Sequence, residues 1–278
     1  MKGTFRAALR NECAKYARQK FPYLGVAFVA LFAVFSVRGI RLILGPRTDL
    51  NGFLAVIMGM IAAITLIIPL FAVIFASALV ASETVGGTYR NVLSRPIGRA
   101  TFLTAKIFFA FAYAVLLVAL YVVVAVSVAL GRYSFGPVLD NGEVVYSLGQ
   151  ILAVSLLACL LTLIPLFAIV SYGILASTAA KSFQSAFGIG VGLLIAVELS
   201  KHFVYRGDWK LADYIFTSYL DTALGIAAKA AAGLDYQWLP WGWWESDLGW
   251  GLMLSLGCAV VFLAASYAIF IRRDLNLS

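Results

Sequence analysis

The chain has 278 residues, of which 63% are hydrophobic and only 12% are charged, with a formal net charge of +8. Soluble domains contain about half apolar and a quarter charged residues, so a soluble fold of this length could not bury so much apolar surface. The composition therefore excludes an ordinary soluble enzyme or nucleic-acid-binding protein and predicts a single transmembrane domain over residues 1–278.

Residues 4–20 precede the first apolar run and are predicted to form an interfacial amphipathic helix. Basic residues spread around its polar side, which would face anionic lipid head groups. A signal peptide is the alternative, but the apolar stretch is followed by an Arg-Gly-Ile-Arg run rather than a small-residue cleavage site. The apolar face is formed by Phe5, Leu9, Cys13 and Tyr16, and the basic residues are Arg6, Arg10, Lys15 and Arg18.

Six apolar runs follow, each at least as long as the roughly 20 residues that a membrane span requires. The fold class is therefore all-α, with six transmembrane helices. A five-span alternative makes the fifth run re-entrant, because that run carries Glu198, Lys201 and His202. The runs cover residues 21–44, 52–80, 101–130, 147–174, 184–205 and 247–271.

Two of the runs share a short motif, Ile-Pro-Leu-Phe-Ala, which places Pro69 and Pro165 in mid-span. A proline inside a helix leaves one backbone carbonyl without its usual partner. The second and fourth spans are therefore expected to run in the same direction and to be kinked at these prolines.

The segment 81–100 connects the second and third spans and is predicted to be a short amphipathic element. Glu83 ends the second span, glycines allow a turn, and a threonine can cap a short helix. A short amphipathic helix held between two long spans is suited to docking a soluble partner protein. A second interpretation is a basic loop in which Glu83 forms an exposed salt bridge with Arg90 or Arg95, worth under about 1 kcal/mol. The residues assigned to docking are Glu83, Gly87, Thr88, Tyr89, Arg90, Val92, Leu93, Ser94, Arg95 and Pro96.

Glu198 is the most deeply placed acid of the spans, with Lys201 and His202 three and four residues later on the same helical face. One interpretation is an ion pair that anchors the helix near the outer head groups. The other is that Glu198, Lys201 and His202 form an outer gate.

An outer segment, 206–246, precedes the last span. All six tryptophans lie between residues 209 and 250, and such rings gather at the membrane–water boundary. Residues 209–232 are predicted to be helical, with Asp208 as N-cap and Gly233 just past the end.

Three widely spaced cysteines and one histidine offer no metal-ligand pattern, so no metal site is expected.

Orientation follows from the distribution of charge. With both termini in the cytoplasm, the inner segments hold thirteen of the 21 basic residues and three of the 13 acidic residues. Positive residues accumulate on the cytoplasmic side, so both termini are predicted to be cytoplasmic and the protein to be a multi-pass inner-membrane protein.

The segment after the second span resembles the ABC-2 family of transporter permeases. That family's loop reads glutamate, Gly-Thr, an apolar pair, then Ser-x-Pro with basic residues up to a lysine. The last residues of the chain, Phe270–Leu275, are similar to the family's usual close. The chain departs from the family at Thr84–Gly86, where the family more often carries charges. The matching positions are Glu83, Gly87, Thr88, Leu93, Ser94, Pro96, Arg99 and Lys106.

The resemblance implies a permease subunit whose 81–100 segment is the coupling element for a separate ATP-binding cassette ATPase. No phosphate-binding loop is present, so the chain is not expected to be an enzyme or to bind a cofactor, and ATP and Mg²⁺ would lie in the partner. The resemblance further implies a second permease copy or a paralogue, contact with membrane lipid, and export. The alternatives are a secondary transporter or another polytopic membrane protein without ATP coupling, including a membrane-embedded enzyme. A secondary transporter usually needs more ionisable residues in mid-membrane, and no catalytic constellation is present.

Overall fold

The computed structural model describes residues 2–45, 50–85, 98–140, 143–201, 205–206, 209–234 and 247–272. Within these ranges, six helices are long and apolar enough to cross a membrane. The all-α, six-span fold class is confirmed.

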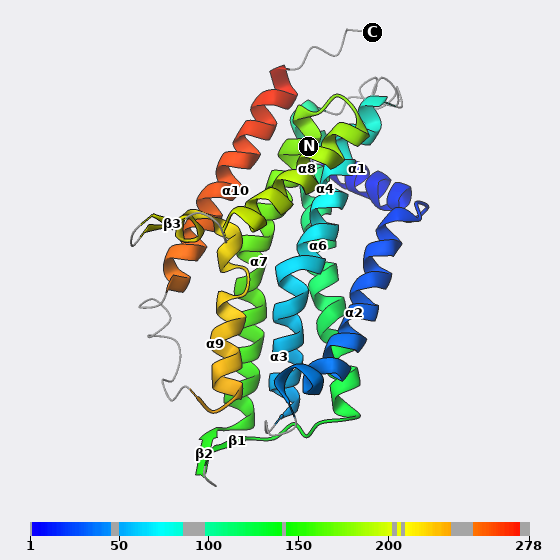
Figure 1. The fold of residues 1–278 in the computed structure, drawn as a ribbon. Coiled ribbons are helices and arrows are strands. Elements are labelled where there is room, and N and C mark those ends of the chain that lie inside the picture. Colours follow the sequence, from blue (N-terminus) through cyan, green and yellow to red (C-terminus); the bar gives the residue numbers. More distant parts are fainter. Residues whose placement is uncertain are drawn as a thin grey trace.

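The spans are arranged as a bundle of long helices (Figure 1). Helix α1 (Lys2–Tyr16) precedes them and lies at an angle to the bundle, near the end at which α10 finishes. A hairpin of β1 (Val138–Asp140) and β2 (Glu143–Tyr146) lies at the opposite end. The spans are α2 (Phe21–Leu44), α3 (Gly52–Ala62) continued by η1 (Ala63–Ile67) and α4 (Ile68–Val85), α6 (Arg99–Leu130), α7 (Leu148–Ala179), α8 (Phe183–Ser200) and α10 (Asp247–Arg272).

Side-chain caps mark the starts of α3, α7 and α8. Asn51 caps α3, because its side chain accepts a hydrogen bond from the Leu54 backbone at 2.7 Å. The Asn51 amide also donates to the Ala231 carbonyl at 2.7 Å, which ties the start of α3 to the end of α9 (Thr222–Ala231). Ser147 and Gln150 form a capping box at the start of α7, as Ser182 and Ser185 do for α8.

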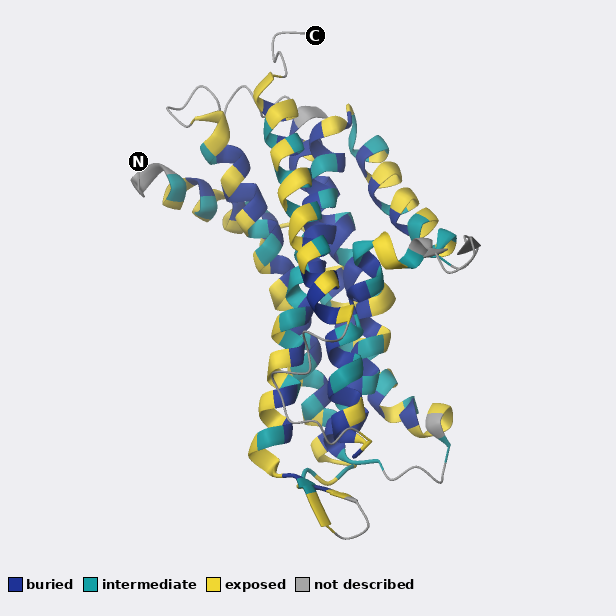
Figure 2. Ribbon diagram, turned by 90° about the vertical axis from the view of Figure 1, so that its left-hand side faces the viewer, coloured by how far each residue is buried: buried dark blue, intermediate teal, exposed yellow. Residues whose placement is uncertain are grey.

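Small residues bring α4 close to its neighbours in the bundle. A side chain added at Gly173 of α7 would place its Cβ 2.7 Å from the Ala76 Cβ, and one at Gly190 of α8 would place it 2.3 Å from the Ser77 hydroxyl. Membrane helices pack through such small residues because they allow the backbones to approach. The buried residues accordingly run through the middle of the bundle (Figure 2). Large apolar side chains such as Phe35, Leu160 and Val260 are exposed on its outside, where lipid would lie.

Three boundary predictions for the spans need correction. Helix α4 ends at Val85 rather than at 80. Helix α7 extends five residues past the predicted end at 174, because Ser177 and Thr178 are buried against other helices rather than exposed to water. Helix α8 ends at Ser200 rather than at 205 and is followed by the strand β3 (Tyr205–Arg206).

The predicted helix 209–232 is wrong over its first half. Residues 209–221 form β4 (Trp209–Lys210), η2 (Leu211–Tyr214) and η3 (Phe216–Tyr219), and α9 begins only at Thr222 with Asp221 as its N-cap. The Asp213 carbonyl accepts hydrogen bonds from Tyr219 and from Trp250 of α10, and these contacts hold the short turns. Asp208, the expected N-cap, lies outside the described residues, and Gly233 follows α9 with a φ of 71°.

The two prolines lie in different local structures. Pro69 follows the π-helical turn η1, in which the Ile68 backbone N–H bonds to the Ala63 carbonyl. The Thr65 hydroxyl donates to the Ile61 and Ala62 carbonyls, which are backbone oxygens at the end of α3 just before this turn. Pro165 lies inside α7, which is assigned as α-helix throughout.

Candidate functional site

Most of the predicted coupling element lies outside the described residues. Gly87, Thr88, Tyr89, Arg90, Val92, Leu93, Ser94, Arg95 and Pro96 belong to this part. Glu83 is the residue of that set whose side chain the structure describes, and it lies in the last turn of α4, where the segment begins.

Glu83 belongs to a buried cluster of four charged residues, named here the root cluster: Glu12, Lys15, Glu83 and Lys106. The Lys106 ammonium is fully buried and donates to both carboxylate oxygens of Glu12 at 3.1 Å and to Glu83 Oε1 at 2.9 Å. Lys15 also donates to Glu83 Oε1, at 2.5 Å. Two acids and two lysines give the cluster a formal charge of zero.

The root cluster joins three elements, two of which flank residues 86–97 in the sequence. Glu12 and Lys15 lie three residues apart on α1, so both reach the same side of that helix. Glu83 ends α4, before the segment, and Lys106 lies in the second turn of α6, after it. The root cluster therefore fixes the interfacial helix against both ends of the segment.

This geometry corrects two expectations from the sequence. Glu83 is only 5% exposed, so its ion pairs are in the buried regime, in which removing one partner costs several kcal/mol, rather than in the exposed one. Its described partners are Lys15 and Lys106, while Arg90 and Arg95 lie outside the described residues. Lys15 was expected to face lipid head groups, but it bonds to Glu83 instead.

An aromatic group packs beside the root cluster. The Tyr16 ring lies 5.2 Å from that of Phe75 in α4 and 5.3 Å from that of Phe109 in α6. Burial raises the pKa of the Tyr16 phenol, and the charges of Glu12 and Glu83 raise it further, so the phenol is neutral. In the described part of the chain, Glu83 Oε2 is a buried oxygen atom without a hydrogen-bond partner. Such an atom costs about 1–3 kcal/mol, which the surrounding packing must offset.

Two further contacts hold the ends of the segment. The Ser177 hydroxyl of α7 donates to the Ser77 carbonyl at 2.6 Å and accepts from the Val80 and Ala81 backbone N–H groups at 3.0 Å. The Arg99 guanidinium at the start of α6 donates to the Ile271 carbonyl of α10 at 3.0 Å. The described elements on the two sides of residues 86–97 thus contact α7 and α10.

The second predicted site lies at the end of α8. Lys201 donates to both carboxylate oxygens of Glu198 at 2.8 Å, and their side chains are 10% and 33% exposed. Burial lowers the pKa of Lys201, and its bonds to Glu198 oppose this shift. Burial also raises the pKa of Asp221, and the positive charge of Lys201 lowers it in part. His202 lies outside the described residues.

Sequence reasoning missed the role of Glu12, Lys15 and Ser177. Glu12 lies in an otherwise basic helix, and Lys106 lies seven residues inside an apolar span. A lysine at that depth requires a counter-charge, which is the signal that could have led to Glu12.

Across the described ranges, no group of three His, Cys, Asp or Glu residues could hold a metal ion.

One family model, ABC-2 family transporter protein, matches residues 8–197 of the chain. This range begins inside α1 and ends three residues before the end of α8, so all four residues of the root cluster lie within it. No curated protein matches the chain.

Proposed function

Because this chain belongs to the ABC-2 family of transporter proteins, we propose that it is the membrane-spanning permease subunit of an ATP-driven exporter. In this proposal the ATPase is a separate chain, and a second permease copy or paralogue completes the transporter. The location is the inner membrane, with both termini in the cytoplasm. The cargo moves by alternating access.

The root cluster is the observation that supports coupling most directly. An ATPase docked on 86–97 would act on a segment whose two ends are α4 and α6. Lys106 joins Glu83 of α4 to Glu12 of α1 by hydrogen bonds of 2.9 and 3.1 Å. A displacement of the segment therefore moves α1, α4 and α6 together, because buried, closely packed contacts do not deform continuously.

The placement of elements supports the proposed orientation. Helix α1, the ends of the coupling segment and the C-terminal end of α10 lie at one end of the bundle (Figure 1). An even number of spans returns the chain to the side on which it started, and this end carries Arg99, Lys181 and Arg272.

The experiment that tests coupling is Leu93→Asp in the full transporter reconstituted with its ATPase subunit. A carboxylate placed in an apolar docking contact should uncouple ATP hydrolysis from transport without affecting membrane insertion. Leu234→Asp is the matched control, because Leu234 is 76% exposed just beyond α9. Unchanged substrate-dependent ATPase activity and transport in Leu93→Asp would refute the coupling role.

Glu198, Lys201 and His202 are the proposed outer gate. Glu198→Gln should leave expression near normal, because the amide is less costly to bury and the pair is partly exposed. If the residue lines the exit, transport of a polar or cationic cargo should fall while ATP binding by the partner stays intact. Full transport by a well-expressed variant would leave Glu198 as an anchoring ion pair only.

A further inference from the structure

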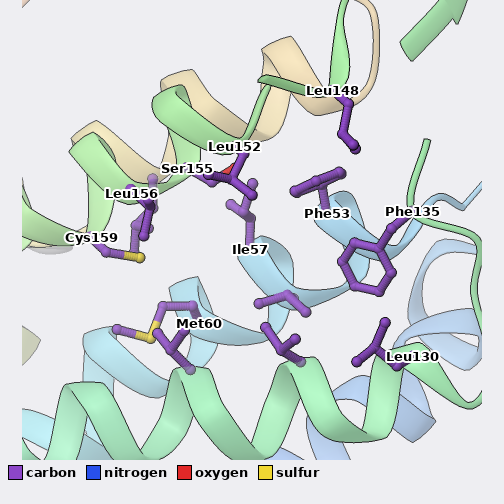
Figure 3. A pocket seen from close by; sticks show the side chains of 14 residues that line it. Phe53, Ile57, Met60, Leu130, Phe135, Leu148, Leu152, Ser155, Leu156 and Cys159 are labelled. Atoms are coloured by element: carbon purple, nitrogen blue, oxygen red, sulfur yellow. The ribbon is translucent and has the colours of Figure 1, made fainter. Parts of the chain in front are cut away.

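A cavity of about 340 Å³ lies between α9 and the ends of α3, α6 and α7 that are remote from α1. Side chains from α6 and α7 face each other across it, with α3 between them (Figure 3). Its innermost wall includes Ile57, Met60 and Leu224, each at most 3% exposed. The volume falls in the range of about 300–1,000 Å³ that is typical of small-molecule sites.

The lining selects for hydrocarbon. Its polar side chains are Ser155 and Cys159, and the Ser155 hydroxyl is already used, since it donates to the Ile151 carbonyl at 2.7 Å. The Cys159 thiol is a small, weakly polar group. A polar ligand would lose its hydrogen bonds with water here and gain almost none, whereas an alkyl chain would gain about 0.8 kcal/mol for each buried CH₂.

The opening of the cavity is flanked by exposed leucines. Leu130 of α6 is 65% exposed, and Leu152 and Leu156 of α7 are 48% and 54% exposed. Three large apolar side chains around one opening would be unfavourable in water. They are compatible with an opening that faces lipid.

The depth of the cavity identifies which lipid region it meets. Helices α6 and α7 have 32 residues each, or about 48 Å at 1.5 Å per residue, which exceeds a hydrocarbon core of about 30 Å. Val122 and Leu130 lie 16 and 24 residues beyond Lys106, at about 24 and 36 Å along α6. With the inner edge of the hydrocarbon core placed at Lys106, the cavity spans the level at which a core of about 30 Å ends. A long apolar span needs tilt or a locally thicker hydrocarbon layer at this level.

We propose that this cavity binds one acyl chain of a bilayer phospholipid, which enters beside Leu130, Leu152 and Leu156. The bound chain extends the hydrocarbon layer along α6 and α7 and covers leucines that would otherwise meet water. The site is formed within one chain and does not depend on ATPase coupling, so its failure and that of the proposed function are distinguishable.

The test uses the full-length protein in nanodiscs that contain a phosphatidylcholine with a diazirine at the end of one acyl chain. After photolysis, mass spectrometry should find adducts on Ile57 or Met60, which are buried and reachable only from inside the cavity. Leu152→Trp and Leu156→Trp each place an indole at the opening, where exposure makes folding tolerant of the change. Both variants should lose most of the adducts on α3.

The matched control is Val260→Trp on α10, a position 66% exposed and outside the cavity. This variant should retain the α3 adducts, and adducts on the exposed face of α10 should persist in Leu152→Trp. Adducts confined to exposed faces would overturn the proposal, as would α3 adducts that Leu152→Trp leaves unchanged. Labelling of α3 by a free diazirine alkane but not by the phospholipid would assign the cavity to another apolar ligand. Crosslinks through these helices to a second copy would assign the opening to a protein interface.

Discussion

Lys106 is the single residue on which the root cluster depends, since it bonds to both acids. Lys106→Met would leave Glu12 and Glu83 buried, with Lys15 as the remaining cation of the root cluster. We expect a loss of about 3–5 kcal/mol in the free energy of unfolding, the usual cost of breaking a buried ion pair. Thermal unfolding of the purified protein, followed by tryptophan fluorescence, measures this loss as a lower Tm.

Two comparisons separate charge pairing from simple loss of packing. Lys15→Met should cost less, because the Lys15 side chain is 28% exposed and Lys106 still neutralises Glu83. The triple variant Lys106→Met, Glu12→Gln, Glu83→Gln should recover much of the lost stability, since no buried charge is left unpaired. A wild-type Tm for Lys106→Met alone would show that the root cluster does not stabilise the bundle.

Among the elements, helix α8 offers a test of close packing within one helix. Gly190→Val would force the added Cβ against the Ser77 hydroxyl of α4, where the distance from an ideal Cβ is 2.3 Å. We expect α8 to separate from α4, with destabilisation of about 1–3 kcal/mol and a lower yield of monodisperse protein. Gly188→Val is the control, because an added Cβ there has no atom within 4 Å. Equal behaviour of the two variants in detergent would contradict the contact.

The sequence predicts the spans well because hydrophobicity and length act locally. All six are confirmed, and α2 has the predicted bounds. The errors arise where tertiary contacts decide the structure: Ser177 prolongs α7 by bonding to α4, and Asp213 holds the turns that replace half of a predicted helix. The pattern of polar and apolar residues over 209–221 fits a helix and also fits short turns packed on α10. The pattern alone therefore could not distinguish a helix from these turns.

Of the root cluster, the sequence pointed to Glu83 as a docking residue and to Lys106 through the family resemblance, and only the fold shows that they lie together with Glu12 and Lys15. Lys106 is 94 residues from Glu12 and 23 from Glu83, so no local period connects them. Lys15 fits the pattern of a lipid-facing basic residue equally well, and only its distance of 2.5 Å from Glu83 distinguishes the two roles. Long-range charge pairs of this kind require the helix arrangement to be known first.

The orientation of the whole molecule can be tested by cysteine labelling with an impermeant reagent. In a background without Cys13, Cys159 and Cys258, cysteines introduced at positions 140 and 235 should react from outside the cell. Cysteines at positions 10 and 90 should react only after the membrane is opened. These expectations follow from the excess of basic residues at the end of the bundle that carries α1. Reaction of position 90 from outside intact cells would overturn the orientation.

The root cluster also imposes an order on the biogenesis of the protein. Glu12 is synthesised 94 residues before Lys106, an interval of about 5–20 s at translation rates of roughly 5–20 residues per second. Until the second and third spans have been synthesised, α1 lacks α4 and α6 to pack against, and an amphipathic basic helix can bind at the membrane surface in the meantime. Arrival of the third span then supplies the missing cation and draws Glu12 into the protein. A nascent chain stopped before residue 106 should therefore keep α1 accessible to protease, and one stopped after the third span has inserted should protect it.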